Sequence, residues 1–245
     1  MQGSELSHGR DRFDRRAFCK TVGIAAAVGM AGASMGSVPV HADLTKEQRD
    51  KLTPDEILQQ MKAGNERFRS GKPQHRDLVR EAKATAKGQY PAAIVFGCVD
   101  SRVPAEVVLD YGIGDIFSGR VAGNIADEDI MGSMEFACKV TGSKVVLVMG
   151  HTACGAIKGA IDDVKLGNLT ALLAKIRPAV EATQYGGERT SKNYAFVDAV
   201  ARKNVELTIA KIREQSPVLR ELESSGSIKI AGSMYNLETG AVDFL

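Results

Sequence analysis

Three side chains of this sequence form a set suited to binding a transition metal. Cys98 supplies one thiol, and about fifty residues later His151 and Cys154 supply an imidazole and a second thiol. Two sulfurs and one nitrogen are borderline-soft ligands of the kind that zinc prefers. Three protein ligands leave one position of a tetrahedral zinc open for water, as in catalytic zinc sites. The residue types therefore predict a catalytic metal centre.

Asp100 and Arg102 lie in the same segment as Cys98. An arginine and a carboxylate can form a rigid bidentate pair, and the positive charge keeps the carboxylate ionised. The alternatives are a salt bridge within a loop or a helix cap. Because metal-type ligands flank the pair, we interpret it as part of the chemistry.

Each ligand segment directly follows a short apolar run. The run 92–97 precedes Cys98, and the run 145–149 is followed closely by His151. Continuous apolar runs of this length are typical of strands buried on both faces of a parallel sheet. Ligands that follow neighbouring parallel strands meet at the carboxyl edge of the sheet. This arrangement would bring the three ligands together.

The remaining pattern alternates strands with helices, which predicts an α/β domain with a central, largely parallel sheet flanked by helices. Thr53, Pro54 and Glu56 form a helix start that opens an N-terminal helical arm, able to pack on a neighbouring molecule. We expect that helix to end near Gly71. Further strands are expected at 115–121, 228–232 and 242–245, and further helices at 78–87, 104–110, 127–141, 154–166, 168–182 and 193–214.

The first 42 residues differ in composition from the rest. Arg15 and Arg16 precede an apolar run rich in Gly and Ala at 21–38, and a small-residue exit ends at Ala42. This pattern is typical of an export signal, and the adjacent arginines indicate the twin-arginine export machinery as a partner. We therefore expect a periplasmic or otherwise exported protein. The alternative is an uncleaved membrane anchor, which so many Gly and Ala residues disfavour.

Residues 43–245 are the predicted mature chain and form one expected domain. They carry 27 basic and 27 acidic side chains, so no basic surface indicates nucleic acid. Three cysteines remain, and an odd number cannot all pair internally. A disulfide between Cys98 and Cys154 is the alternative to a metal site. Cys138 lies in a helical pattern, and we expect it to be a small buried apolar residue.

Three motifs together resemble the β-class carbonic anhydrases in order and spacing. The resemblance covers essentially the whole mature chain, and the combination is specific although each motif alone is weaker. It implies one Zn²⁺ ion per subunit, held by Cys98, His151 and Cys154. It also implies reversible hydration of carbon dioxide to bicarbonate and a proton by a zinc-bound hydroxide, the activity of a carbonate dehydratase. The motifs are the segments 98–102, 114–124 and 150–155.

The resemblance also implies roles for Asp100 and Arg102. Asp100 would accept a hydrogen bond from the hydroxide and orient it, while Arg102 would hold the carboxylate. In some relatives the matching aspartate instead becomes a fourth zinc ligand and closes the site. Both states remain open for Asp100.

Substrate contacts are implied less directly. The amide of Gln89 would donate to bicarbonate, and the backbone N–H of Gly155 would face the substrate. An apolar pocket for carbon dioxide would be formed by Ala93, Val95, Phe117, Ala122 and Phe136. Gln89 and Phe136 would reach across the interface of a homodimer or tetramer. The alternatives are a solvated loop for Gln89, a tight turn for Gly155 and ordinary core packing for the aromatic rings.

One departure concerns the subtype. Some bacterial relatives carry a tryptophan three residues before the first cysteine, within an inhibitory bicarbonate site. This chain has Val95 there and no tryptophan at all, which favours the plant-like form. Proton transfer to solvent would use His75, Tyr90 or buffer.

Two other functions remain alternatives to carbonate dehydratase activity. The same site could hydrolyse carbon disulfide or carbonyl sulfide, which are similar linear molecules. The chain could also be a non-catalytic zinc-binding module with Asp100 as a permanent ligand. The presence of Arg102 disfavours the second alternative, because a purely structural site has no need of it.

Overall fold

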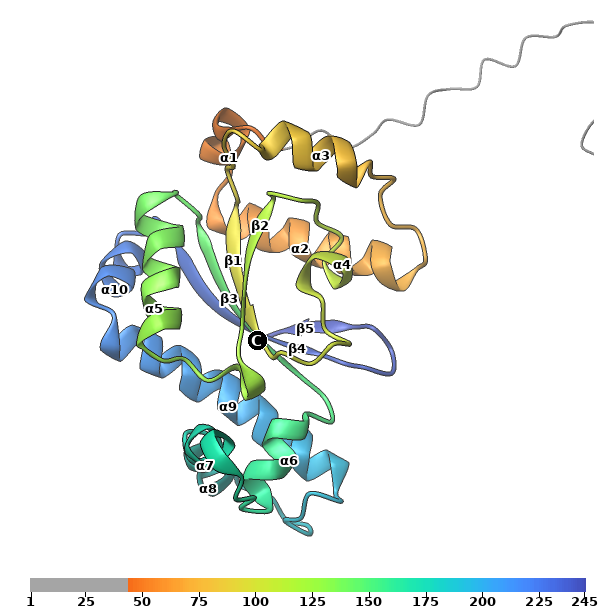
Figure 1. The fold of residues 1–245 in the computed structure, drawn as a ribbon, viewed down its shortest axis with the longest axis vertical. Helices are drawn as coiled ribbons and strands as arrows, with labels where there is room; N and C mark the ends of the chain where they lie inside the picture. The colour runs from red at the N-terminus through yellow and green to blue at the C-terminus, as the bar shows by residue number, and fades with distance from the viewer. Residues whose placement is uncertain (1–43) are drawn as a thin grey trace, which may run out of the picture. The chain divides into compact units, whose positions relative to one another are not determined.

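A five-stranded sheet with the order β2-β1-β3-β4-β5 forms the centre of the structure (Figure 1). Four strands are parallel, and the short last strand pairs antiparallel to β4. The expectation of a largely parallel sheet is confirmed. The strands are β1 (Ala93–Gly97), β2 (Ile116–Arg120), β3 (Val145–His151), β4 (Lys229–Tyr235) and β5 (Val242–Phe244).

The structure is a computed structural model that describes residues 44–245. The predicted export signal lies outside the described residues. Among the described residues, no helix is both long and apolar enough to cross a membrane.

Strand register explains why the two ligand segments meet. β1 lies between β2 and β3, and Gly97 at the end of β1 is paired with Met149 of β3. Every residue of β1 and β3 is buried, as their continuous apolar runs predict. Cys98 and His151 therefore emerge at the same carboxyl edge of the sheet.

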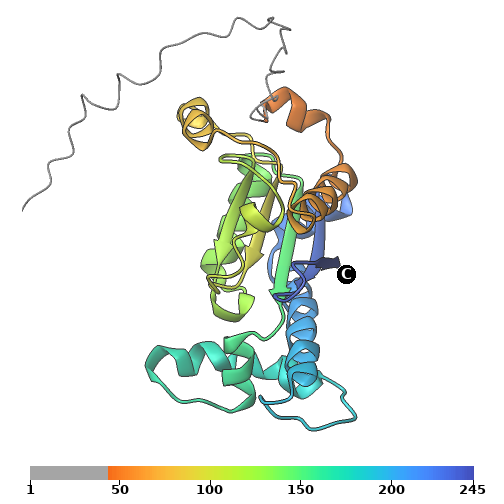
Figure 2. The same cartoon turned by 90° about the vertical axis from the view of Figure 1, so that its right-hand side faces the viewer.

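Helices cover both faces of the sheet and extend beyond its carboxyl edge (Figures 1 and 2). One face packs against α5 (Glu128–Glu135), the π-helical turn η3 (Phe136–Val140), α9 (Tyr194–Gln215) and α10 (Pro217–Ser224). The other face packs against α2 (Pro54–Arg69) and α4 (Ala105–Val108), preceded by α1 (Lys46–Lys51). α3 (Leu78–Thr85) follows α2, and α6 (Gly155–Ile161), α7 (Gly167–Ala174) and α8 (Arg177–Ala182) follow β3.

Alternating side chains of β1 supply both cores. Ile94 and Phe96 belong to the cluster under α9, whereas Val95 belongs to the cluster under α2. Alternation follows from the two-residue period of a strand. Val95 is 1% exposed and faces α2 rather than the ligand residues.

The predicted N-terminal helical arm packs on its own chain over much of its length. Thr53 caps α2 through the predicted capping box with Glu56. Asn65 on α2 donates to the carbonyl oxygens of Val108 and Gly240, each at 2.9 Å. These contacts anchor α2 to α4 and to the loop before β5. α1 is also fastened to the same chain, because its buried Arg49 donates to the carbonyl oxygen of Thr141 at 2.6 Å.

The helix predicted at 168–182 is wrong as a single element. The chain forms α7 and α8 instead, with a break at Lys175 and Ile176. Pro178 lies in the first turn of α8. Proline has no backbone N–H and disfavours helical geometry in the preceding residue, so a helix tends to end before it.

Candidate metal centre

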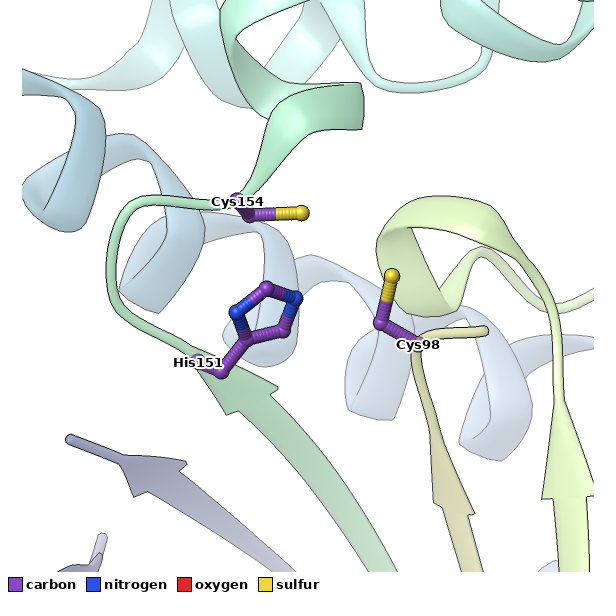
Figure 3. A group of neighbouring side chains, drawn as sticks. All are labelled: Cys98, His151 and Cys154. Atoms are coloured by element: carbon purple, nitrogen blue, oxygen red, sulfur yellow. The ribbon is translucent and has the colours of Figure 1, made fainter. Parts of the chain in front are cut away.

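The ligand atoms of Cys98, His151 and Cys154 all lie within 4.8 Å of one another (Figure 3). All three residues are buried. Cys98 follows β1, His151 ends β3, and Cys154 directly precedes α6 at its N-cap position. Both cysteines are free thiols, so the alternative of a Cys98–Cys154 disulfide is wrong.

The imidazole of His151 is oriented by a backbone contact. Its Nδ1 lies 2.9 Å from the carbonyl oxygen of Thr152. We assign the proton to Nδ1, because only a donor can pair with a carbonyl oxygen, and Nε2 then carries a lone pair. Nε2 is buried and has no hydrogen-bond partner among residues 44–245. A buried unpaired nitrogen beside two thiols fits a zinc ion, whose charge would satisfy it.

The two sulfurs differ in their surroundings. The hydrogen bond with Cys154 lowers the pKa of Cys98 to about 4, although burial opposes this shift. The backbone N–H of Gly123 also donates to the Cys98 sulfur, at 3.3 Å. The same sulfur–sulfur contact and burial raise the pKa of Cys154. Bound zinc would favour the thiolate at both positions, since a coordinating thiol is deprotonated.

Asp100 and Arg102 form the predicted bidentate pair. Arg102 donates from Nε to Oδ1 at 2.9 Å and from Nη2 to Oδ2 at 2.7 Å. Its backbone N–H donates to Oδ1 at 3.0 Å. These hydrogen bonds hold the pKa of Asp100 well below its usual range. Oδ2 of Asp100 lies 3.9 Å from Nε2 of His151, which places the carboxylate beside the ligand cluster.

The predicted substrate residues fall into two groups: two small residues next to the ligand cluster in sequence, and a pair of phenylalanines that pack against each other. Gly155 directly follows Cys154 and begins α6, and Ala122 begins the short turn η2 (Ala122–Asn124), next to Gly123. Gly155 is therefore the sequence neighbour of one candidate ligand, and Ala122 is the neighbour of the residue that contacts the Cys98 sulfur. Phe117 and Phe136 pack edge to face with ring centroids 6.2 Å apart, and Phe136 is 52% exposed.

Gln89 does not join the ligand cluster within one chain. It is exposed and precedes β1, whereas Cys98 follows the opposite end of that strand. Tyr90 lies at the same end as Gln89, and His75 is exposed in the segment between α2 and α3. A role for Gln89 therefore requires a second copy of the chain.

Arg120 and Gly123 both lie in the motif 114–124, but the sequence alone gives no signal of what either residue contacts. Arg120 contacts the backbone of the Cys98 segment, and Gly123 contacts the Cys98 sulfur. Gly123 has φ +69, a left-handed conformation that favours glycine. The motif therefore positions the first ligand.

A parallel α/β sheet with a Cys-His-Cys cluster at its carboxyl edge defines a metalloenzyme of the zinc type. Residues 93–242 match the family described as carbonic anhydrase. The chain is 35% identical over 186 residues to carbonic anhydrase 2 of Mycobacterium tuberculosis, covering 74% of this chain and 87% of that protein. It is 32% identical over 189 residues to the carbonic anhydrase of Mycolicibacterium smegmatis, covering 75% and 89%.

Solved structures agree with this assignment. A tetrameric β-carbonic anhydrase of Sordaria macrospora is 26% identical, with a TM-score of 0.59, and the match covers 66% of this chain and 84% of that one. The fold also matches the Coccomyxa β-carbonic anhydrase in complex with acetazolamide, with a TM-score of 0.60 at 22% identity, over 78% and 82% of the two chains. The chain belongs to the carbonic anhydrase family, in its β class.

Proposed function

We propose that this chain catalyses the reversible hydration of carbon dioxide to bicarbonate and a proton, using one zinc ion. Cys98, His151 and Cys154 hold the ion. The observation that carries this proposal is an ion-paired carboxylate beside three buried ligand atoms at one edge of the sheet. A structural zinc site normally has four protein ligands, so three ligands and a separate carboxylate favour catalysis.

When bound, zinc supplies a Lewis acid that makes water a strong enough nucleophile near neutral pH. Cys98 and Cys154 each contribute a negative charge to the site. Three imidazoles would contribute none, so two thiolates reduce the net positive charge felt by water. We therefore expect activity to increase toward alkaline pH.

Asp100 orients the nucleophile. An ionised carboxylate only accepts hydrogen bonds, and Arg102 keeps this one ionised and fixed. A hydroxyl group that donates to Oδ2 has its lone pairs free to face the substrate carbon. Arg102 is a positioning residue, because it acts through the carboxylate.

The open arrangement is the proposed resting state. As a fourth metal ligand, Asp100 would have to weaken the three hydrogen bonds that Arg102 donates to it. The intact pair supports a site in which the fourth position remains available to water.

Carbon dioxide is a small apolar molecule, and the proposed pocket for it includes Ala122, Phe117 and Phe136. The N–H of Gly155, at the start of α6, is the proposed contact for the bicarbonate oxygen. Absence of a tryptophan at Val95 supports the plant-like subtype. That subtype predicts hyperbolic rather than cooperative dependence of the dehydration rate on bicarbonate.

A second copy of the chain is the proposed partner at the edge of the sheet. β2 is an edge strand. Two apolar side chains beside it are exposed: Phe136, which packs against Phe117 of β2, is 52% exposed, and Val107 on the neighbouring α4 is 56% exposed. The tetrameric relative from Sordaria macrospora supports assembly as a homodimer or tetramer. Light scattering of the wild type and of Phe136→Asp tests this proposal, since the charged variant should dissociate.

Export by the twin-arginine route is proposed for residues 1–42, followed by a single domain at 43–245. The support is the pair Arg15 and Arg16 before an apolar run. Changing both arginines to lysine should retain the full-length chain in the cytoplasm. Continued export of that variant would contradict the proposal.

Stopped-flow measurement of carbon dioxide hydration by the zinc-loaded protein tests the function. We expect zinc-dependent turnover that fails in Asp100→Asn. The same samples should be supplied with carbon disulfide and carbonyl sulfide. Turnover of these sulfur compounds alone would identify the alternative hydrolase, and zinc binding without any turnover would identify a non-catalytic module.

A further inference from the structure

The turn between His151 and Cys154 has a strained backbone. Ala153 has φ 54, in the left-handed region that a residue with a Cβ atom disfavours. Only two residues separate the second and third ligands, so the conformation of this turn fixes the Cys154 sulfur relative to the imidazole. Something outside the turn must hold it.

Asp198 on α9 holds the strained residue. Its Oδ1 accepts a hydrogen bond of 2.8 Å from the backbone N–H of Ala153. The preceding residue, Thr152, is held by two other hydrogen bonds. Its backbone N–H donates to the carbonyl oxygen of Tyr235 at 2.9 Å, and its Oγ1 accepts from the backbone N–H of Leu237 at 3.0 Å. A bond to an ionised carboxylate is stronger than one between neutral groups.

The same helix supports the first ligand from the other side. Asn204 on α9 donates from Nδ2 to the carbonyl oxygen of Gly123 at 2.7 Å. The N–H of Gly123 in turn donates to the Cys98 sulfur at 3.3 Å. Asn204 is buried. One helix therefore contacts both loops that carry or contact the metal ligands.

α9 can act as a rigid support because it is embedded in the core. Val197, Val200 and Val205 are fully buried and pack under the sheet. Gly150 and Gly232 allow the strands to lie close to this helix, since a Cβ at Gly150 would lie 2.7 Å from Val205 and one at Gly232 would lie 2.9 Å from it.

We infer that Asp198 and Asn204 are positioning residues of the metal site, which set the ligand geometry from a single helix. This inference rests on the zinc site proposed above. Neither residue is a ligand, so their loss should weaken metal binding without removing a donor atom. Loss of such supporting hydrogen bonds typically lowers metal affinity by about 10- to 100-fold.

The test compares Asp198→Ala and Asp198→Asn with the wild type and with Glu206→Ala, an exposed acid on the same helix. Zinc affinity is measured by competition with a chelator, and ligand geometry by the absorption spectrum of the cobalt(II) form. Asp198→Ala should lose about 10- to 100-fold in affinity and alter the spectrum. Asp198→Asn keeps an acceptor oxygen and should recover most of that loss, while Glu206→Ala should match the wild type.

Ala153→Gly tests whether backbone strain at residue 153 causes the expected loss of zinc affinity. Glycine adopts positive φ without strain, so the loss caused by Asp198→Ala should be smaller when Ala153 is also glycine. This pair of variants remains informative if Asp198→Ala alone folds poorly. Asn204→Asp, which removes the donor to Gly123, should also lower zinc affinity.

Wild-type zinc affinity in Asp198→Ala, with an unchanged cobalt spectrum, would overturn the inference. An equal loss with and without Ala153→Gly would overturn the assigned cause. A wild-type chain that binds neither zinc nor cobalt would instead overturn the proposed metal site itself.

Discussion

Arg120 donates a hydrogen bond of 2.8 Å from Nε to the backbone carbonyl oxygen of Cys98. A second nitrogen of the same guanidinium contacts the carbonyl oxygen of Asp100. Arg120 is the last residue of β2. A single side chain therefore ties the end of one strand to the segment that carries both the first proposed ligand and the proposed catalytic carboxylate.

Arg120→Ala should reduce turnover and zinc affinity together, by roughly 10-fold or more, because it releases the segment that bears Cys98. Arg120→Lys should recover little, since one ammonium group cannot reproduce the fork of a guanidinium. Arg80→Ala, at an exposed position on α3, is the control. Metal analysis with hydration kinetics measures both effects, and wild-type values in Arg120→Ala would contradict this role.

Asp100→Asn should retain stoichiometric zinc, because the three proposed ligands are unchanged. Hydration near pH 7 should fall by roughly 100-fold or more, since the amide no longer offers an ionised acceptor. Metal content and stopped-flow rates on the same sample separate the two effects. Activity equal to the wild type would refute the orienting role, and lost zinc would show that Asp100 is a ligand.

Glu223 should make stability depend on pH. Arg213 donates to it from Nε and Nη2, each at 2.8 Å, and these bonds lower the pKa of Glu223. A carboxyl whose pKa is lower in the folded state stabilises the fold above its unfolded pKa of about 4.3. That stabilisation is lost as pH falls through the folded value.

The free energy of unfolding of Glu223→Gln should therefore decrease less between pH 6 and pH 3 than that of the wild type. Glu221→Gln, on the exposed side of the same helix, is the matched control. Denaturant unfolding across this pH range measures the difference. Identical acid profiles for Glu223→Gln and the wild type would contradict the prediction.

Cys138 should be chemically inert. Burial raises the pKa of its thiol to about 12, so at pH 8 only about one molecule in ten thousand carries the reactive thiolate. Mass spectrometry after iodoacetamide treatment should find Cys138 unmodified with or without a chelator. Cys98 should react once the metal is removed, and rapid labelling of Cys138 would show that its region opens readily.

The sheet was predictable because its central strands are buried on both faces. The runs at β1 and β3 carry no charged residue, and that composition alone distinguishes them from the surrounding helices. Ligand convergence followed from the same runs, since each ends at or just before a ligand. The helix α1 was missed, although Thr45 and Gln48 form a capping box that could have indicated it.

The supporting contacts were not predictable from sequence. Asp198 contacts Ala153 across 45 positions, and Asn204 contacts Gly123 across 81. An aspartate or asparagine on a long helix gives no local signal of its partner. Such pairings depend on how α9 crosses the sheet, which only the folded chain determines.

The most direct test of the metal site is X-ray absorption at the zinc edge, combined with metal content, on active full-length protein. We predict one zinc per chain with two sulfur ligands and one imidazole nitrogen, and loss of the metal in Cys98→Ser and His151→Ala. Active protein without zinc, or with Cys98 and Cys154 joined as a disulfide, would contradict the proposed zinc site.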